Sequence, residues 1–274
     1  MIQLIAIDLD GTLLDSKKHI PKENIKAIQA AAREGIKVVL CTGRPQSGTR
    51  PYFEQLGLSD KEEYLILNNG CSTYRSPSWE LLHYQSLTFS AIEHLYQLSQ
   101  PFSDIYLTLT GERDYLVIDS KVPDMVQADG DLVFTTVKAT SLSQLSSSSQ
   151  IIFQAMYMGE KPALDAFEAR VREKLSASFS VVRSQETILE VMPECVTKAS
   201  ALKELTADLK LRPDQVMAIG DAANDLEMLA YAGLGVAMGN ADEAIKKVAD
   251  KVSLSNDQAG VAHAIYQLAL PKGS

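Results

Sequence analysis

Cysteine and histidine are scarce in this chain, and neither residue type is clustered. The three cysteines are odd in number and far apart, so they predict neither a disulfide framework nor a zinc pattern; they are Cys41, Cys71 and Cys195. The four histidines are equally scattered and fit surface or packing positions better than a metal site; they are His19, His83, His94 and His263.

Long apolar runs and basic clusters are also missing. No stretch approaches the length of a membrane span, and no basic region precedes the apolar amino terminus. The net charge is −9 with lysine and arginine dispersed, which argues against a nucleic-acid surface. We therefore expect a cytoplasmic protein with neither a nucleic-acid nor a membrane partner.

Glycine-rich cofactor loops are not evident either. No Walker A string occurs, and the glycines between Gly233 and Gly239 follow a helical pattern without the context of a dinucleotide fingerprint. We interpret this stretch as a turn around a short edge strand.

What is present is an alternation of apolar strands and amphipathic helices. Strands and helices alternate from Ile2 to Leu67, and the same pattern resumes after residue 190, as in a parallel sheet with helical crossovers. Residues 85–190 instead mix short strands with helices and carry no cluster of acidic residues. The sequence predicts an α/β core of residues 1–84 and 191–274, interrupted by an α+β insertion of residues 85–190.

Two carboxylates, Asp8 and Asp10, follow the first strand. In an extended backbone they would lie on the same side, where their mutual repulsion calls for a cation. A bare D-x-D pair is more often a solvated turn, but here an apolar strand fixes it at a carboxyl end, where α/β sheets bind ligands. Mg²⁺ is the natural partner of such oxygens.

Further polar residues end or follow other core strands. Thr42 and Asp221 each stand at a predicted strand end, and Asp225 follows in the loop after Asp221. Thr42-Gly43 is alone more typical of a loop and helix cap, and Asp225 could simply favour a helix amino terminus. Lys198, just before a helix, is a suitable counter-charge for a phosphoryl group, although most lysines are solvated.

These stretches, in this order, resemble the four motifs of the haloacid-dehalogenase-like superfamily. D-L-D-G-T-L-L, V-M-P-x-x-V-T-K-A-S-A-L, G-D-x-x-N-D-L-E-M-L and G-V-A-M-G-N-A are similar to its Cof-type branch, which includes sugar-phosphate phosphatases. The resemblance implies a Rossmann-like core with an inserted C2B-type cap that governs substrate specificity.

The resemblance also implies roles for single residues. Asp8 would be the nucleophile and Asp10 the general acid/base, with Thr42 and Lys198 completing the catalytic set. The implied Mg²⁺ ligands are Asp8, Asp10 (through its carbonyl), Asp221 and, in support, Asp225. The implied phosphate contacts are Leu9, Thr42, Gly43, Arg44, Lys198 and Asn224.

The predicted activity is hydrolysis of a small phosphorylated metabolite through an aspartyl phosphate. Two alternatives stay open: a phosphomutase of the same superfamily, and a phospho-accepting signalling module. Free phosphate release would separate the enzyme from the mutase, and a short-lived phosphoryl-aspartate would separate it from the module.

Overall fold

Eight strands form the sheet that carries the candidate residues. A computed structural model describes residues 1–271. The strand order is β14-β13-β12-β1-β2-β3-β4-β5, and the pairs from β14 to β3 are all parallel. The bounds are β1 (Leu4–Asp8), β2 (Lys37–Cys41), β3 (Tyr64–Leu67), β4 (Ser72–Arg75), β5 (Glu80–Tyr84), β12 (Val216–Gly220), β13 (Leu234–Ala237) and β14 (Lys251–Val252).

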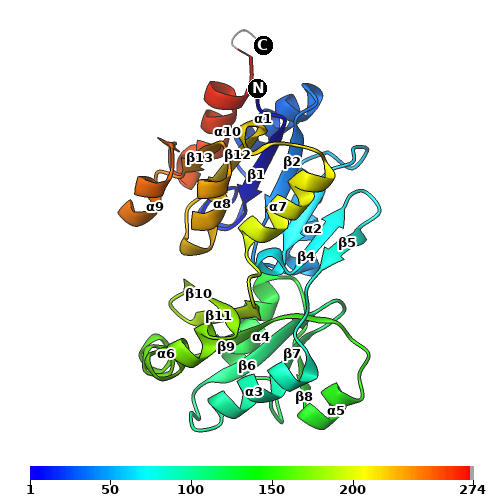
Figure 1. Ribbon diagram of the computed structural model, residues 1–274, viewed down its shortest axis with the longest axis vertical. Helices are drawn as coiled ribbons and strands as arrows, with labels where there is room; N and C mark the ends of the chain where they lie inside the picture. The colour runs from blue at the N-terminus through cyan, green and yellow to red at the C-terminus, as the bar shows by residue number, and fades with distance from the viewer. Residues whose placement is uncertain (272–274) are drawn as a thin grey trace. The chain divides into compact units, whose positions relative to one another are not determined.

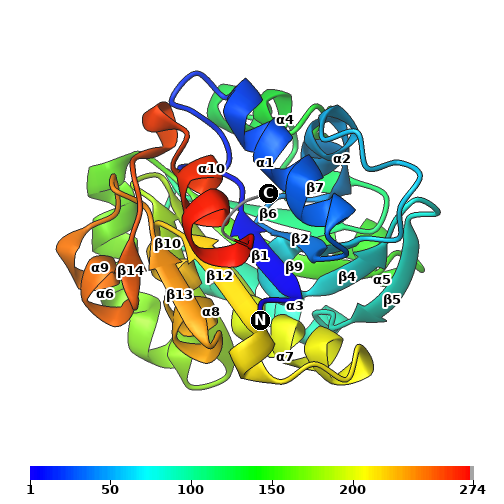
Figure 2. The same ribbon diagram turned by 90° about the horizontal axis from the view of Figure 1, so that it is seen from above.

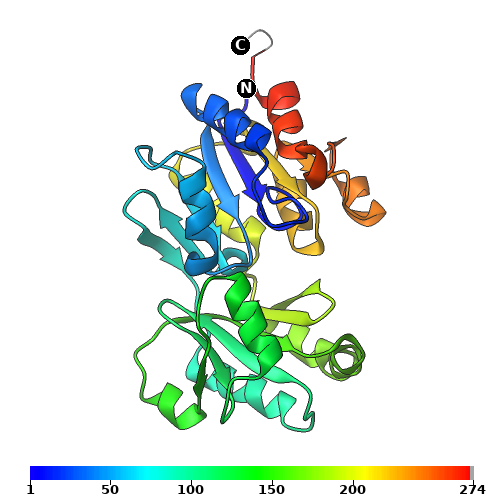
Figure 3. The ribbon, with the colours of Figure 1, turned by 180° about the vertical axis from the view of Figure 1, so that it is seen from behind.

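Helices cover both faces of this sheet. Apolar side chains of α1, α2 and α10 pack on one face, and those of α7, α8 and α9 pack on the other. Figure 2 looks along the sheet between these two layers, and Figure 3 brings α1 and α10 to the front. The bounds are α1 (Lys22–Arg33), α2 (Gln46–Gln55), α7 (Lys198–Asp208), α8 (Leu226–Tyr231), α9 (Glu243–Val248) and α10 (Gly260–Ala264).

The central strand explains why the sheet forms. All five residues of β1 are buried, as expected for a parallel strand covered on both faces. Ile5 and Ile7 point into one apolar layer, whereas Leu4 and Ala6 point into the other. The predicted α/β class with a parallel core sheet is confirmed.

One local expectation was wrong. The glycine-rich stretch does contain a short strand, β13, but this strand is not at the edge, because β14 pairs beyond it through Val236 and Lys251. β14 has only two residues, both exposed, and so leaves no hydrophobic pattern that the sequence could reveal.

The described chain divides into two compact units. The first contains residues 1–43, 49–83 and 197 onward, and the second contains residues 44–48 and 84–196. The second unit has its own six-stranded sheet in the order β10-β11-β9-β6-β7-β8, mostly antiparallel. Its strands are β6 (Tyr106–Gly111), β7 (Tyr115–Ile118), β8 (Lys138–Thr140), β9 (Ile152–Met158), β10 (Phe179–Gln185) and β11 (Ile188–Pro193).

This second unit buries two apolar clusters of its own. Helices α3, α5 and α6 pack on one face of its sheet, and α4 packs on the other (Figure 1). Its helices are α3 (Phe89–Ser99), α4 (Asp124–Leu132), α5 (Leu142–Ser146) and α6 (Lys161–Ser176). The inserted segment is therefore an α+β unit with a separate core. None of the described helices is both long enough and apolar enough to span a bilayer.

Candidate active site

Three strand ends meet at one edge of the first sheet. β1 pairs with β12 on one side and with β2 on the other. Asp8 is the last residue of β1, while Thr42 and Asp221 directly follow β2 and β12. The structure thus brings together three residues from remote parts of the chain.

Lys198 completes this group from the start of α7. Its side chain is fully buried, and Nζ lies 2.6 Å from Oδ1 of Asp8 and 2.7 Å from Oδ1 of Asp225. The N-cap Thr197 and its reciprocal hydrogen bonds with Ser200 fix the first turn of α7 that carries the lysine. One ammonium is therefore shared between two buried carboxylates.

The loop after β3 holds Lys198 in place. Gly70 has a φ of +99°, and a Cβ there would lie 2.2 Å from the carbonyl oxygen of Thr197. Only glycine permits both this backbone conformation and this close approach. The Asn68–Gly70 turn and the start of α7 are therefore packed backbone against backbone.

Asp225 supports its neighbours with both carboxylate oxygens. Oδ1 accepts the hydrogen bond from Lys198, and Oδ2 accepts from the main-chain nitrogens of Asp221 (3.0 Å) and Ala222 (3.1 Å). Its side chain is fully buried. These contacts fix the loop that presents Asp221.

Asp221 is itself oriented by two side chains. Thr12 donates to Oδ1 at 2.8 Å, and Asn240 donates to Oδ2 at 3.4 Å and to the carbonyl oxygen of Gly11 at 2.9 Å. Gly11 has a φ of +79°, and a Cβ there would lie 2.3 Å from Oδ2 of Asp221. Gly11 thus lets the Asp8–Leu14 loop close onto the Asp221 carboxylate.

The electrostatics of this cluster favour a bound cation. Burial, followed by the charge of Asp225, raises the pKa of Asp8 well above its ordinary value despite the opposing effect of Lys198. Burial and Asp225 likewise raise the pKa of Asp221 to about 6. Burial opposes the charge on Lys198, but Asp225 and Asp8 outweigh it and raise its pKa. One ammonium does not compensate three clustered acids.

The donor set fits a hard divalent metal. Oxygens of Asp8, Asp221 and Asp225 lie within 4.8 Å of one another. Oδ2 of Asp8 is buried and accepts no hydrogen bond from any residue that the structure describes. A buried oxygen in this condition is costly unless a cation satisfies it. An oxygen-only set of this kind suits Mg²⁺ or Ca²⁺ better than softer metals.

Asp10 lies apart from the buried cluster. Its side chain is 37% exposed, and Oδ1 lies 2.6 Å from the ammonium of Lys18. The carboxylate of Asp10 is therefore accessible to solvent, unlike those of Asp8 and Asp225.

The predicted phosphate contacts divide into two groups. Leu9 and Thr42 are buried beside the cluster, and the main chain of Thr42 joins β3 and its following turn through Ile66 and Asn69. Asn224 donates to Oδ1 of Asn69 at 3.0 Å. These residues and Gly43 belong to the first unit, the one that contains Asp8.

Arg44 makes a different set of contacts. Its buried guanidinium donates to the carbonyl oxygen of Leu132 at 2.8 Å and approaches that of Gly48 at 3.4 Å. All three residues belong to the second unit. The described contacts of Arg44 therefore connect it to the end of α4.

Sequence reasoning missed four partners of the predicted residues: Thr12, Lys18, Asn69 and Asn240. Thr12 and Asn240 stand inside the quoted motifs, so their position was a usable signal. Asn69 follows the end of β3, so its position was a signal as well. Lys18 carried no signal beyond residue type, because its partner is set by a turn with left-handed backbone, at a φ of 61°.

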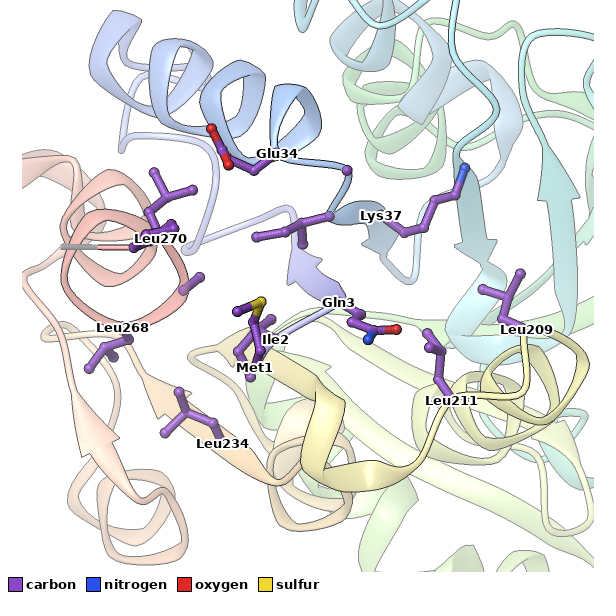
Figure 4. A pocket seen from close by; sticks show the side chains of 14 residues that line it. Met1, Ile2, Gln3, Glu34, Lys37, Leu209, Leu211, Leu234, Leu268 and Leu270 are labelled. Carbon is purple, nitrogen blue, oxygen red and sulfur yellow. The ribbon is translucent and has the colours of Figure 1, made fainter. Parts of the chain in front are cut away.

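An apolar pocket lies at the other end of the same sheet. It has a volume of about 890 Å³ and is lined by residues that precede β1 and β2, such as Ile2 and Ile36, and by Leu209, Leu234 and Leu270. Figure 4 shows mostly aliphatic side chains around it. Asp8 lies at the opposite end of β1, so this pocket is not the site of the acid cluster.

Comparisons with known proteins agree with this geometry. The family model of haloacid dehalogenase-like hydrolases matches residues 5–265. Phosphatase YwpJ of Bacillus subtilis is 32% identical, and the match covers 97% of this chain and all of the relative. The 5-amino-6-(5-phospho-D-ribitylamino)uracil phosphatase YcsE of the same organism is 32% identical over 96% of this chain and 94% of its own.

A solved structure shows the same architecture. The chain resembles a haloacid dehalogenase-like hydrolase from Bacteroides thetaiotaomicron with a TM-score of 0.85 and 31% identity, over 97% of this chain and 98% of that one. The strand-end carboxylates, the buried lysine and these matches lead to one conclusion: the chain belongs to the haloacid dehalogenase-like hydrolase family and is a phosphatase.

Proposed function

We propose that this phosphatase hydrolyses small phosphate monoesters, sugar and polyol phosphates foremost, through a phosphoryl group carried on Asp8, with Mg²⁺ as cofactor. The observation that carries the proposal is the buried Oδ2 of Asp8, which has no described donor and lies in one cluster with Asp221. A carboxylate held in this way has one oxygen fixed by Lys198 and one oxygen directed at whatever ligand the cluster binds.

The metal site would be built from Asp8, the carbonyl of Asp10 and Asp221. Asp225 fits a supporting position, because both of its oxygens already accept hydrogen bonds. When bound, Mg²⁺ supplies charge neutralisation between the carboxylate nucleophile and the phosphoryl oxygens.

Lys198 favours the reactive form of Asp8. Burial favours the protonated form, which is no nucleophile; Lys198 opposes this effect without overcoming it, so the bound cation would be needed to hold the carboxylate ionised. Its ammonium lies 2.6 Å from Oδ1 and fixes the plane of the carboxylate toward the phosphorus. Thr42, Gly43 and Asn224 would donate to the phosphoryl oxygens from the neighbouring strand ends.

Asp10 would exchange the proton in both steps. In the first step, an oxygen of Asp8 bonds to phosphorus, the ester P–O bond breaks, and Asp10 gives its proton to the leaving alkoxide. In the second step, water bonds to phosphorus, the bond to Asp8 breaks, and Asp10 takes the proton from the water. The products are an alcohol and inorganic phosphate.

The substrate class rests on the relatives and on the inserted unit. A relative with 32% identity is named for a phosphorylated ribityl compound, which is a polyol phosphate. We propose that the second unit is the cap that selects the leaving group, since it is an inserted domain with a core of its own. Fold alone does not identify the natural ester.

The Asp10→Asn variant tests the mechanism. The leaving group of p-nitrophenyl phosphate needs no proton, so the first step should proceed and the second should stall. Rapid-quench kinetics should show a burst of p-nitrophenol equal to the enzyme concentration, and mass spectrometry should locate the phosphoryl group on Asp8. A phosphoryl group on another residue, or no burst together with no labelled protein, would overturn the proposal. Wild-type enzyme that returns the phosphoryl group to a sugar would instead indicate a mutase.

A further inference from the structure

Lys18 contacts the proton-exchanging residue of the proposed mechanism. Its Nζ lies 2.6 Å from Oδ1 of Asp10, and the two side chains are 45% and 37% exposed. An exposed pair of this kind contributes little to the stability of a protein. Its interest lies in what the ammonium does to the carboxyl group of Asp10.

The turn that carries Lys18 is tightly built. Two main-chain hydrogen bonds close it. The nitrogen of Asp15 donates to the carbonyl oxygen of His19 at 2.9 Å, and the main-chain nitrogen of Lys18 donates to the carbonyl oxygen of Asp15 at 3.0 Å. The carboxylate of Asp15 accepts from the main-chain nitrogens of Lys17 at 2.9 Å and His19 at 2.8 Å. Lys18 itself has a φ of 61°, a backbone conformation that most residues avoid.

The turn is also anchored to a distant part of the first unit. Ser16 donates to Oδ1 of Asp257 through its main-chain nitrogen at 2.8 Å and its hydroxyl at 2.9 Å. Next to it, the side-chain amide of Asn256 donates to the carbonyl oxygen of Leu14 at 2.9 Å. The backbone on both sides of Lys18 is thus fixed before any substrate binds, which lowers the entropy cost of holding its ammonium at Asp10.

We propose that Lys18 is the positioning residue of Asp10. Its ammonium holds Oδ1 and so fixes the plane of the carboxyl group, while the other oxygen exchanges the proton with the leaving group and then with water. This inference rests on the proposed function. Proton transfer requires a donor within about 2.6–3.2 Å of the accepting oxygen, so a carboxyl group that rotates freely would spend little time in the productive geometry.

A substrate-binding lysine would behave differently. Such a residue would contribute to the capture of every phosphate ester and would change KM for alkyl and aryl substrates alike. A positioning residue of the acid instead affects the step in which a poor leaving group needs its proton. The two roles therefore separate on a pair of esters.

The test compares Lys18→Met, Lys18→Arg and the matched control Lys17→Met. Lys17 is exposed and, among the described contacts, gives this turn only its main-chain nitrogen. For Lys18→Met we expect the first step on an alkyl phosphate, such as glycerol phosphate, to slow by about tenfold or more. The first step on p-nitrophenyl phosphate should stay within about twofold of wild type. Lys18→Arg should recover most of the loss, and Lys17→Met should match wild type on both esters.

The outcomes are separable in one set of quenched samples. Equal slowing on both esters, or no slowing on either, overturns the role of Lys18, provided that the thermal unfolding midpoint is unchanged. Asp10→Asn, quenched in the same series, reports the proposed function by itself, because its second step stalls and it accumulates phosphoryl-Asp8 only if Asp8 is the nucleophile. A failure of that proposal is therefore visible before any lysine variant is compared.

Discussion

Lys198 and Asp8 form an ion pair of 2.6 Å in a place where the lysine side chain is fully buried. Both ions have lost their water, so their mutual attraction must offset two desolvation costs. Asp225 is attached to the same ammonium at 2.7 Å, which leaves two carboxylates dependent on one cation. The reactivity of Asp8 and the stability of this edge of the sheet therefore rest on the same contact.

Lys198→Met should abolish turnover and also destabilise the fold. Removal of one partner from a buried ion pair typically costs about 3–5 kcal/mol, because the remaining charges are left uncompensated. Urea denaturation at neutral pH measures this cost. The loss should shrink in mild acid, since protonation of Asp8 removes part of the uncompensated charge. Lys26→Met, at an exposed position of α1 with no described side-chain contact, should change the free energy of unfolding by less than about 0.5 kcal/mol. A Lys198→Met protein as stable as this control would contradict the structural role.

Asp8→Asn should abolish turnover without destabilising the fold, unlike Lys198→Met. The amide cannot accept a phosphoryl group, so turnover should vanish. The raised pKa of Asp8 means that its ionised form is unfavourable in the fold, so a neutral side chain of the same shape should relieve this strain. We expect the metal-free variant to unfold at a temperature equal to or above that of the metal-free wild type, as measured by calorimetry. Retained turnover within about tenfold of wild type would exclude Asp8 as the nucleophile.

Metal binding should depend on pH through Asp221 and Asp8. A carboxyl group whose folded-state pKa is raised binds its proton more tightly when folded. Its contribution to stability is therefore greatest below the unfolded value of 3.8 and falls as the pH rises toward about 6. Mg²⁺ competes with these protons, so its apparent affinity should rise with pH through about 6, where Asp221 loses its proton, and level off only once Asp8 has lost its proton as well. Calorimetric titration with Mg²⁺ at several pH values across this range measures the affinity. A constant affinity would mean that the acid cluster is not the metal site.

Asn240 should matter for metal binding, in addition to the hydrogen bonds by which it joins Gly11 and Asn256. It orients Asp221 from outside the cluster, and loss of such a partner typically weakens metal affinity by about 10–100-fold. Asn240→Ala should show this loss in titrations with Mg²⁺, while excess Mg²⁺ restores most of kcat. Thr12→Val, which removes the other hydrogen bond to Asp221, should behave in the same way. An unchanged affinity in both variants would mean that Asp221 needs no such support.

The residues predicted from the sequence are those that local pattern and sheet geometry determine together. Asp8, Thr42 and Asp221 each end an apolar strand, and parallel strands collect their carboxyl ends at one edge, so their meeting followed from a general rule. Their partners followed from no such rule. Asn240 follows a stretch whose sequence predicts a turn around a short edge strand, and its contact with Gly11 depends on the position of β13 inside the sheet.

Helix α4 of the inserted unit has a weak signal in the sequence. Helix α4 contains Gly130, which weakens any helical pattern. The structure explains the glycine, because a Cβ at Gly130 would lie 2.6 Å from the side chain of Val137. The close packing of the segment after α4 thus required a residue that hid the helix from sequence reasoning.

The order of the strands in the first sheet has a consequence for folding during synthesis. β1 lies between β2 and β12, and β12 begins only at Val216, after the whole second unit has been synthesised. Until then, one side of a fully buried strand of the core is an open edge, which is the feature that promotes wrong pairing with other chains. The second unit is contiguous apart from residues 44–48 and is complete by Val196. We therefore expect the inserted unit to fold first on the ribosome, and the nascent core to need protection until β12 arrives.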